Sequence, residues 1–118
     1  MSIPAWQERT ELLMGKEALQ KLASSHVLVV GLGGVGGILT EMLARAGIGE
    51  MTIIDGDHVQ ATNRNRQLVA FSSNEGKDKA AIMERRLKDI NPDIIVHSHV
   101  EFVKDERIDE ILETKYDY

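Results

Sequence analysis

The sequence predicts an α/β fold in which helices flank a parallel β-sheet. Short apolar runs rich in β-branched residues alternate with longer segments whose apolar residues recur at helical spacing. The order strand, helix, strand, helix, strand, helix indicates parallel strands joined by right-handed crossovers. Because ligands of such sheets bind at the carboxyl ends of the strands, functional residues are expected in the loops that follow them.

The strands are expected where the apolar runs are short. The first run, HVLVV, is typical of a strand that is buried on both faces. A further strand is expected to begin near the end of the chain, after the last predicted helix. The predicted strands cover residues 26–30, 51–54 and 94–96, and the further strand would begin near residues 115–118.

Four helices are expected from apolar residues that return every three or four positions. In the second of them, Ile38, Leu39, Met42, Leu43 and Ala46 recur at this spacing and suggest the face that packs. The predicted helices cover residues 15–24, 35–46, 78–90 and 105–114.

Composition and charge narrow the classes of protein. The chain has 118 residues, a net charge of −5 and no cysteine, which excludes disulfides, thiolate metal ligands and a cysteine nucleophile within it. The acidic balance opposes general binding to nucleic acid, which would need a local basic patch. No apolar stretch is long enough to span a membrane, and residues 1–9 lack the apolar run of a secretory signal. We therefore expect a cytoplasmic protein without membrane contact.

A glycine-rich turn follows the first predicted strand. The segment GLGGVG fits the pattern G-x-G-x-x-G through Gly31, Gly33, Gly34 and Gly36. Such glycines let the backbone approach a phosphate closely, and the N-terminus of the next helix offers free N–H groups to an anion. Asp55, directly after the second strand, can accept both hydroxyls of a ribose. These features predict a nucleotide site, but they fit NAD and ATP equally well.

The segment TNRNRQ favours ATP over NAD. It lies in a polar loop, residues 56–76, and a loop of that length is usually functional or disordered. Guanidinium groups match phosphate oxygens in pairs, and amides can orient them. An NAD-dependent dehydrogenase has no general need for these groups. A triphosphate is therefore indicated by Asn63, Arg66, Gln67 and, near the start of the next helix, Lys79.

These motifs resemble the ThiF/MoeB/HesA family of adenylating enzymes, the bacterial relatives of ubiquitin-activating enzymes. The resemblance runs from about residue 9 to residue 96 and is carried by GLGGVG, the D-x-D after the second strand, N-x-x-R-Q and the lysine that follows. It implies a Rossmann-like fold, truncated after a βαβαβ nucleotide-binding unit. Residues 1–118 would be the N-terminal part of an ATP-binding adenylation domain. The form TNRNRQ, with GKDKA and INP downstream, is most similar to the tRNA threonylcarbamoyladenosine dehydratases.

The resemblance also implies roles for individual residues. Arg66 and Lys79 would bind the triphosphate and stabilise charge as pyrophosphate leaves. Arg9 matches an N-terminal arginine that reaches the γ-phosphate of the neighbouring subunit's ATP, which implies a homodimer. Arg64 has no counterpart and is expected to be a loop residue. The implied nucleotide-binding residues are Gly31, Gly33, Gly34, Gly36, Asp55, Asn63, Arg66, Gln67 and Lys79.

Part of the family's machinery falls beyond Tyr118. The Mg²⁺-binding aspartate of the family lies on the strand after the last predicted helix, and the part that binds the acceptor follows it. We therefore expect no metal ligand within this chain. We also expect the 118-residue piece to be inactive by itself.

The implied function is ATP-dependent adenylation of a carboxylate by a tRNA threonylcarbamoyladenosine dehydratase. One alternative is an adenylyltransferase that activates the C-terminus of a ubiquitin-like sulfur carrier, and the acceptor distinguishes the two. An NAD-binding oxidoreductase domain would keep the glycine turn but leave Arg66, Gln67 and Lys79 unexplained. A catalytically inactive module that only dimerises is the third class.

The remaining polar residues predict no further site. His97 and His99 alternate on a strand-like stretch and can share a face, but two ligands without a third nearby do not predict a zinc site. His26 and His58 flank strands and are expected at the surface. Asp57 is expected to be a solvated acid in the loop.

Overall fold

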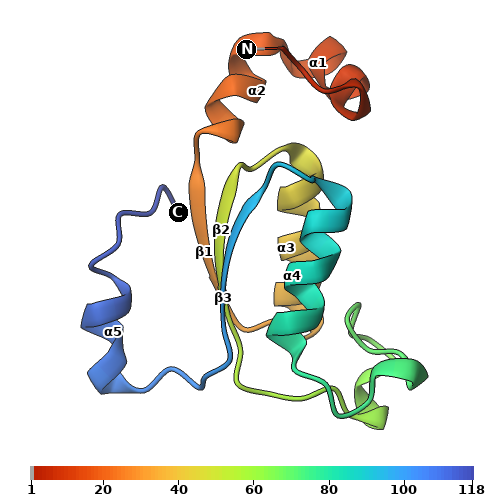
Figure 1. The fold of residues 1–118 in the computed structure, drawn as a ribbon, viewed down its shortest axis with the longest axis vertical. Coiled ribbons are helices and arrows are strands. Elements are labelled where there is room, and N and C mark those ends of the chain that lie inside the picture. Colours follow the sequence, from red (N-terminus) through yellow and green to blue (C-terminus); the bar gives the residue numbers. More distant parts are fainter. Residues whose placement is uncertain (1) are drawn as a thin grey trace.

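A computed structural model describes residues 2–118 and confirms the predicted α/β fold. Three parallel strands, β1 (His26–Val30), β2 (Glu50–Ile54) and β3 (Ile95–His99), lie in the order of the chain. The helices α3 (Gly34–Ala46) and α4 (Lys79–Ile90) cover one face of the sheet, and α5 (Asp105–Ile111) lies on the other side (Figure 1). The core lies between the sheet and the first two of these helices.

The chain begins with helices that the sequence did not predict. A 3₁₀ turn, η1 (Ala5–Gln7), and α1 (Glu8–Met14) precede α2 (Lys16–Ala23), which was expected at residues 15–24. Leu12 and Leu13 of α1 are 81% and 85% exposed. Because α1 buries none of its residues, its sequence carries no clear apolar face. These helices stand at the end of the sheet where the strands begin (Figure 1).

The prediction that β1 is buried on both faces was wrong. Val27 and Val29 point into the core and are 7% and 6% exposed. Val30, on the opposite face, is 57% exposed. On that side of the sheet, α5 lies over Ile54 but leaves Val30 uncovered.

The face that α3 buries also differs from the predicted one. Ile38, Leu39 and Met42 are all more than two-fifths exposed, whereas Gly37 and Ala44 face the core. A side chain at Gly37 would lie 3.1 Å from a backbone carbonyl oxygen of the glycine turn. Small residues therefore allow α3 to approach the sheet closely. Of the predicted residues, Leu43 packs against the core, whereas Ile38, Leu39 and Met42 are exposed.

The polar loop after β2 is anchored to the core. It contains two 3₁₀ turns, η2 (Ala61–Asn63) and η3 (Ser72–Asn74). Val59 and Val69, at 2% and 0% exposed, pack into the main apolar cluster. The loop is thereby held at the carboxyl ends of the strands, beside the glycine turn (Figure 1).

The end of the chain lies along the free edge of β1. Asp117 donates its backbone N–H to the His26 carbonyl oxygen at 2.8 Å, and Leu28 donates to the Tyr118 carbonyl at 3.0 Å. Both segments run in the same direction, as expected where a further parallel strand begins. No helix in residues 2–118 is both long and apolar enough to cross a membrane.

Candidate nucleotide site

The glycine turn joins β1 to α3 at the carboxyl end of the sheet. Gly31 has a φ of 95°, in the left-handed region that favours glycine. A Cβ on Gly36 would lie 1.8 Å from the Gly31 carbonyl oxygen. The backbone of the turn therefore requires both of these glycines, whether or not a ligand binds.

Gly34 has a different surrounding. A Cβ at this position would meet nothing within 4 Å, so the backbone of Gly34 faces open space. Gly33, the residue before α3, provides no side-chain cap to the helix. The first N–H groups of α3 are thus free to bind an anion, as the sequence predicts for this turn.

Asp55 lies directly after β2 and links the glycine turn to the following loop. Its Oδ2 accepts the backbone N–H of Leu32 at 2.7 Å, and its Oδ1 accepts that of Asp57 at 2.8 Å. These bonds fix the carboxylate beside the turn, where a ribose was expected. Each oxygen keeps a second lone pair with which it could accept a hydroxyl.

A cavity of about 420 Å³ brings the glycine turn and the polar loop together. Gly34, Arg66 and Gln67 all line it. Two of the residues predicted to bind the triphosphate therefore lie next to the N-terminus of α3. The lining residues are Gly34, Ile38, Arg64, Asn65, Arg66, Gln67 and Leu68.

The two arginines of this cavity are bonded differently. Arg66 Nη1 donates to the Thr62 carbonyl oxygen at 3.2 Å and to Asn65 Oδ1 at 2.9 Å, both neutral acceptors. Arg64 forms an ion pair with Glu75 at 3.4 Å. Within residues 2–118, no carboxylate pairs with the exposed Arg66, so its charge remains available to an anion.

Gln67 lies against the glycine turn. Its Nε2 is 3.5 Å from the position that a Cβ on Gly33 would occupy. Its buried Oε1 accepts no hydrogen bond from the described part of the chain. A buried amide without a partner is costly, and a ligand hydroxyl or a water molecule would satisfy it.

Lys79 lies at the start of α4 and is only 3% exposed. Its Nζ is 3.3 Å from Asp57 Oδ2, so Asp57, which was expected to be a solvated acid, pairs with a buried lysine while its own side chain stays 42% exposed. The backbone N–H of His58 and the Lys79 ammonium together lower the pKa of Asp57. Lys79 does not line the cavity of Arg66 and Gln67. To reach a phosphate there, it would have to exchange its carboxylate partner for the phosphate.

Asn63 and Arg9 lie apart from this cavity. The Oδ1 of Asn63 accepts the backbone N–H of Gln60 at 2.9 Å and thereby closes the turn η2. Arg9 is exposed on α1, near the end of the sheet where the strands begin, and the glycine turn lies at the opposite end (Figure 1). Arg9 therefore does not contribute to the cavity of its own chain.

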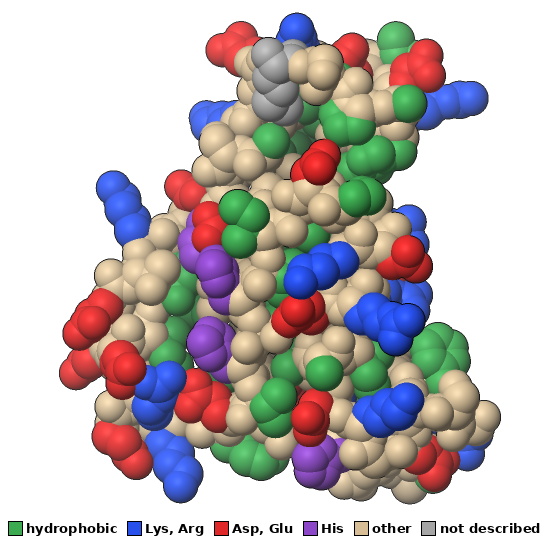
Figure 2. Space-filling view, viewed as in Figure 1, with side chains coloured by type: hydrophobic (Ala, Val, Ile, Leu, Met, Phe, Trp, Pro, Cys, Tyr) green, Lys and Arg blue, Asp and Glu red, His purple; other side chains and the backbone are tan. Residues whose placement is uncertain are grey.

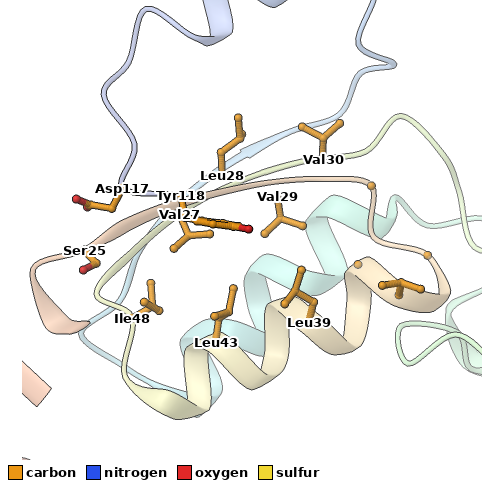
Figure 3. Close-up of a pocket in the computed structure, with 14 residues that line it drawn as sticks. Ser25, Val27, Leu28, Val29, Val30, Leu39, Leu43, Ile48, Asp117 and Tyr118 are labelled. Carbon is orange, nitrogen blue, oxygen red and sulfur yellow. The ribbon is translucent and has the colours of Figure 1, made fainter. Parts of the chain in front are cut away.

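A larger cavity of about 690 Å³ runs along the free edge of β1 (Figure 3). Apolar side chains of β1 and α3, among them Val27, Val29, Leu39 and Leu43, form most of its lining. It reaches the glycine turn at one end only. Because it offers few polar groups, the smaller cavity beside Arg66 suits phosphates better.

Comparison with known proteins agrees with the geometry. A family model described as "ThiF family" matches residues 7–118. The chain belongs to the ThiF family. The fold and the predicted family are thereby confirmed.

Relatives with a named activity match most of the chain. The chain is 43% identical over 117 residues to the tRNA threonylcarbamoyladenosine dehydratase of Escherichia coli. This match covers 97% of the chain and 44% of the relative. A crystal structure of the E. coli dehydratase in complex with ATP has a TM-score of 0.92 at 41% identity. This match covers 98% of the chain and 49% of the solved one. The chain thus spans less than half the length of these relatives.

A second kind of ThiF-family relative is an adenylyltransferase and sulfurtransferase of Lodderomyces elongisporus. The chain is 43% identical to this enzyme over 84 residues. The match covers 71% of the chain and 18% of the relative. The sequence therefore resembles both kinds of enzyme that were predicted.

Three features of the site were not predicted from the sequence. Arg64 lines the cavity and pairs with Glu75, although it was expected to be an ordinary loop residue. The role of Asn63 in closing η2 and the pairing of Lys79 with Asp57 were also missed. The D-x-D motif was the one signal that could have indicated a partner for the lysine.

Proposed function

We propose that the protein containing this chain is an ATP-dependent adenylating enzyme, and that residues 1–118 are the N-terminal part of its adenylation domain. The observation that carries this proposal is the cavity that Arg66 and Gln67 line together with Gly34 at the start of α3. A free guanidinium, an amide and uncapped helix N–H groups are suited to a triphosphate. The ATP complex of the E. coli dehydratase supports the choice of nucleotide.

The reaction is attack of a carboxylate oxygen on the α-phosphorus of ATP. A bond forms between that oxygen and the α-phosphorus, the bond to the β-phosphate oxygen breaks, and pyrophosphate leaves with the electron pair. The residues of this chain would position the phosphates and stabilise the charge on the leaving group. Arg66, whose guanidinium donates only to neutral acceptors, would take this role, and Lys79 would join it by leaving Asp57.

The proposed substrate is the carboxylate of a threonylcarbamoyl group on a tRNA adenosine. Similarity to the dehydratases of three bacteria supports this assignment. The adenylate would then cyclise and release AMP, with a net loss of water from the modified base. The alternative acceptor, the C-terminus of a ubiquitin-like sulfur carrier, is supported by similarity to the adenylyltransferase and sulfurtransferase.

We also propose that the enzyme is a homodimer in which Arg9 acts across the interface. Arg9 lies far from the glycine turn of its own chain, and α1 exposes Leu12 and Leu13 beside it. Subunits carrying Arg9→Ala mixed with subunits carrying Asp55→Ala should recover part of the activity. Failure of every such mixture to recover activity would contradict a role in trans.

Two further features belong to this proposal. The Mg²⁺ ligands are expected in the part of the relatives that follows the segment matching this chain, and the 118 residues alone are expected to be inactive. The site of action is expected to be the cytoplasm.

Calorimetry with ATP and with NAD tests the class of nucleotide. ATP should bind to the protein, and the binding should weaken in Arg66→Ala. NAD should bind weakly or not at all. Tight binding of NAD without binding of ATP would instead favour the oxidoreductase alternative, because Gly31 and Asp55 serve either nucleotide.

A further inference from the structure

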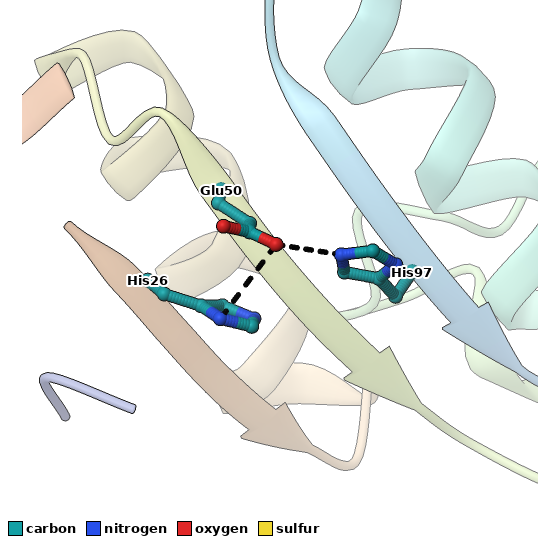
Figure 4. Close-up of side chains that lie close together, drawn as sticks. All are labelled: His26, Glu50 and His97. Atoms are coloured by element: carbon teal, nitrogen blue, oxygen red, sulfur yellow. Dashed lines mark hydrogen bonds and ion pairs between the residues drawn. The ribbon is translucent and has the colours of Figure 1, made fainter. Parts of the chain in front are cut away.

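The face of the sheet on the side of α5 carries a cluster of metal-binding side chains that the nucleotide site does not use. His26 of β1, Glu50 of β2 and His97 of β3 come from three different strands (Figure 4). The register pairs His26 with Glu50, and it places His97 one step further along the same face, opposite Thr52. Histidine side chains gather over this face of the molecule (Figure 2).

We propose that His26, Glu50 and His97 form a binding site for a divalent zinc-type cation. One ligand atom from each side chain lies within 4.8 Å of the other two. Two imidazoles and one carboxylate are a ligand set that zinc uses when three protein ligands leave a fourth position open. The proposal does not depend on the proposed adenylating activity.

The distances suit this ion after small movements. Glu50 Oε2 lies 2.7 Å from His97 Nε2 and 3.8 Å from His26 Nδ1. Around a tetrahedral zinc with bonds of about 2.0–2.1 Å, neighbouring ligand atoms are about 3.4 Å apart. The side chains of Glu50 and His97 are 35% and 47% exposed, so each has room for such a shift.

Thr52 and Tyr116 hold the first ligand in place. The Nε2 of His26 is 2.7 Å from Thr52 Oγ1, and a proton on Nε2 donated to that oxygen leaves Nδ1 free for the metal. The Tyr116 ring packs edge-on against the imidazole at 4.8 Å between centroids. His26 is therefore only 12% exposed, which corrects the expectation that it lies at the surface. Metal-binding histidines commonly have such a partner on the second nitrogen.

Space for a fourth ligand lies beside the cluster. A cavity of about 470 Å³ is lined by the three side chains together with His99, Thr114 and Tyr116. The Tyr116 hydroxyl already donates to the Ile111 carbonyl oxygen at 3.0 Å. A water molecule in this cavity can complete the coordination. The sequence suggested no zinc site at His97 and His99, because a third ligand was not visible near them in the chain.

Titration of the purified protein with zinc chloride, followed by calorimetry, tests the site. The expected result is one zinc per chain, with an affinity that falls at least about tenfold in His97→Gln and in Glu50→Gln. Thr52→Val should weaken binding about tenfold, because it removes only the partner of His26. The matched control is His58→Gln, because His58 lies in the loop after β2 and pairs with Asp78. This variant should bind zinc with the affinity of the wild type.

A spectroscopic readout separates loss of the site from loss of the fold. Cobalt(II) bound at the cluster should give the visible absorption of a four-coordinate ion, and His97→Gln should lose it while its circular dichroism stays unchanged. His97 is the best variant for this purpose because it is half exposed. Absence of zinc binding to the wild type would overturn the proposal. Equal losses in His58→Gln and His97→Gln would overturn it as well.

Discussion

The ammonium of Lys79 lies 3.3 Å from Asp57 Oδ2, and the lysine side chain is 4% exposed while the aspartate is 42% exposed. A buried cation thus depends on a half-exposed carboxylate at the start of α4. The pair lies at the carboxyl end of the sheet, close to the candidate nucleotide site. Loss of the carboxylate should therefore destabilise this end of the fold.

Asp57→Asn should lower the free energy of unfolding at pH 7 by about 1 kcal/mol, since solvent screens the exposed carboxylate and limits the loss. Hydrogen bonding from His58 and Lys79 lowers the pKa of Asp57 in the folded state. The pair therefore stabilises the fold above the unfolded pKa of about 3.9, and this contribution is lost as the pH falls through the folded pKa. Urea unfolding at several pH values measures it. Asp93→Asn, at an exposed acid, is the control, and an effect of equal size there would contradict the account.

Gly34→Ala and Gly36→Ala should differ in their effects on stability. A methyl group on Gly34 meets nothing within 4 Å, so this variant should be as stable as the wild type or up to about 1 kcal/mol more stable. A methyl group on Gly36 meets the Gly31 carbonyl oxygen, and the loss should reach about 2 kcal/mol or more. Thermal unfolding measures the stability of both variants.

Gly34→Ala should also weaken ATP binding about tenfold, a change of about 1.4 kcal/mol. Unchanged binding would show that no phosphate approaches Gly34.

Gln67→Met should separate binding from stability. It removes a buried amide oxygen that accepts no hydrogen bond within residues 2–118, so the free energy of unfolding should stay the same or rise. ATP affinity should fall about tenfold, because the amide beside Gly33 is lost. Calorimetry and urea unfolding of the same preparation check both statements. A large loss of stability would indicate that Gln67 is chiefly a structural residue.

Arg86→Ala should destabilise the packing of α3 against α4. Burial tends to raise the pKa of Glu41, but hydrogen bonds from Arg86 and Arg45 outweigh burial and lower it. Removing Arg86 leaves a carboxylate that is 7% exposed with Arg45 alone, at a cost of about 2 kcal/mol at pH 7. Since the folded pKa is lowered, the difference from the wild type should shrink as the pH falls below about 4. Arg85→Ala, at the exposed neighbouring residue, should change little.

The elements with one buried face were predictable from the sequence. β1 was predicted at its observed residues because its β-branched run favours a strand, although only one of its faces is buried. α4 was predicted within one residue because its apolar residues mark the face that packs on the core. α1 was missed because it buries nothing. The packing face of α3 was predicted only in part, at Leu43, because the small residues Gly37 and Ala44 also face the core.

The candidate sites likewise combine features that the sequence predicts with features that it does not. The glycine turn and Asp55 were placed correctly because each follows a strand. The Lys79–Asp57 pair joins positions 22 residues apart, and the cluster of His26, Glu50 and His97 depends on the register of three strands. Such contacts arise only from the folded arrangement, which local patterns do not encode.

Exchange of labelled pyrophosphate into ATP tests the central claim most directly. The whole protein that contains this chain should catalyse the exchange in the presence of its carboxylate substrate. Arg66→Ala and Lys79→Ala should each reduce it at least about a hundredfold, as the loss of transition-state stabilisation predicts. Exchange that is absent from the wild type, or unchanged by both substitutions, would contradict the proposal that these residues serve an adenylating enzyme.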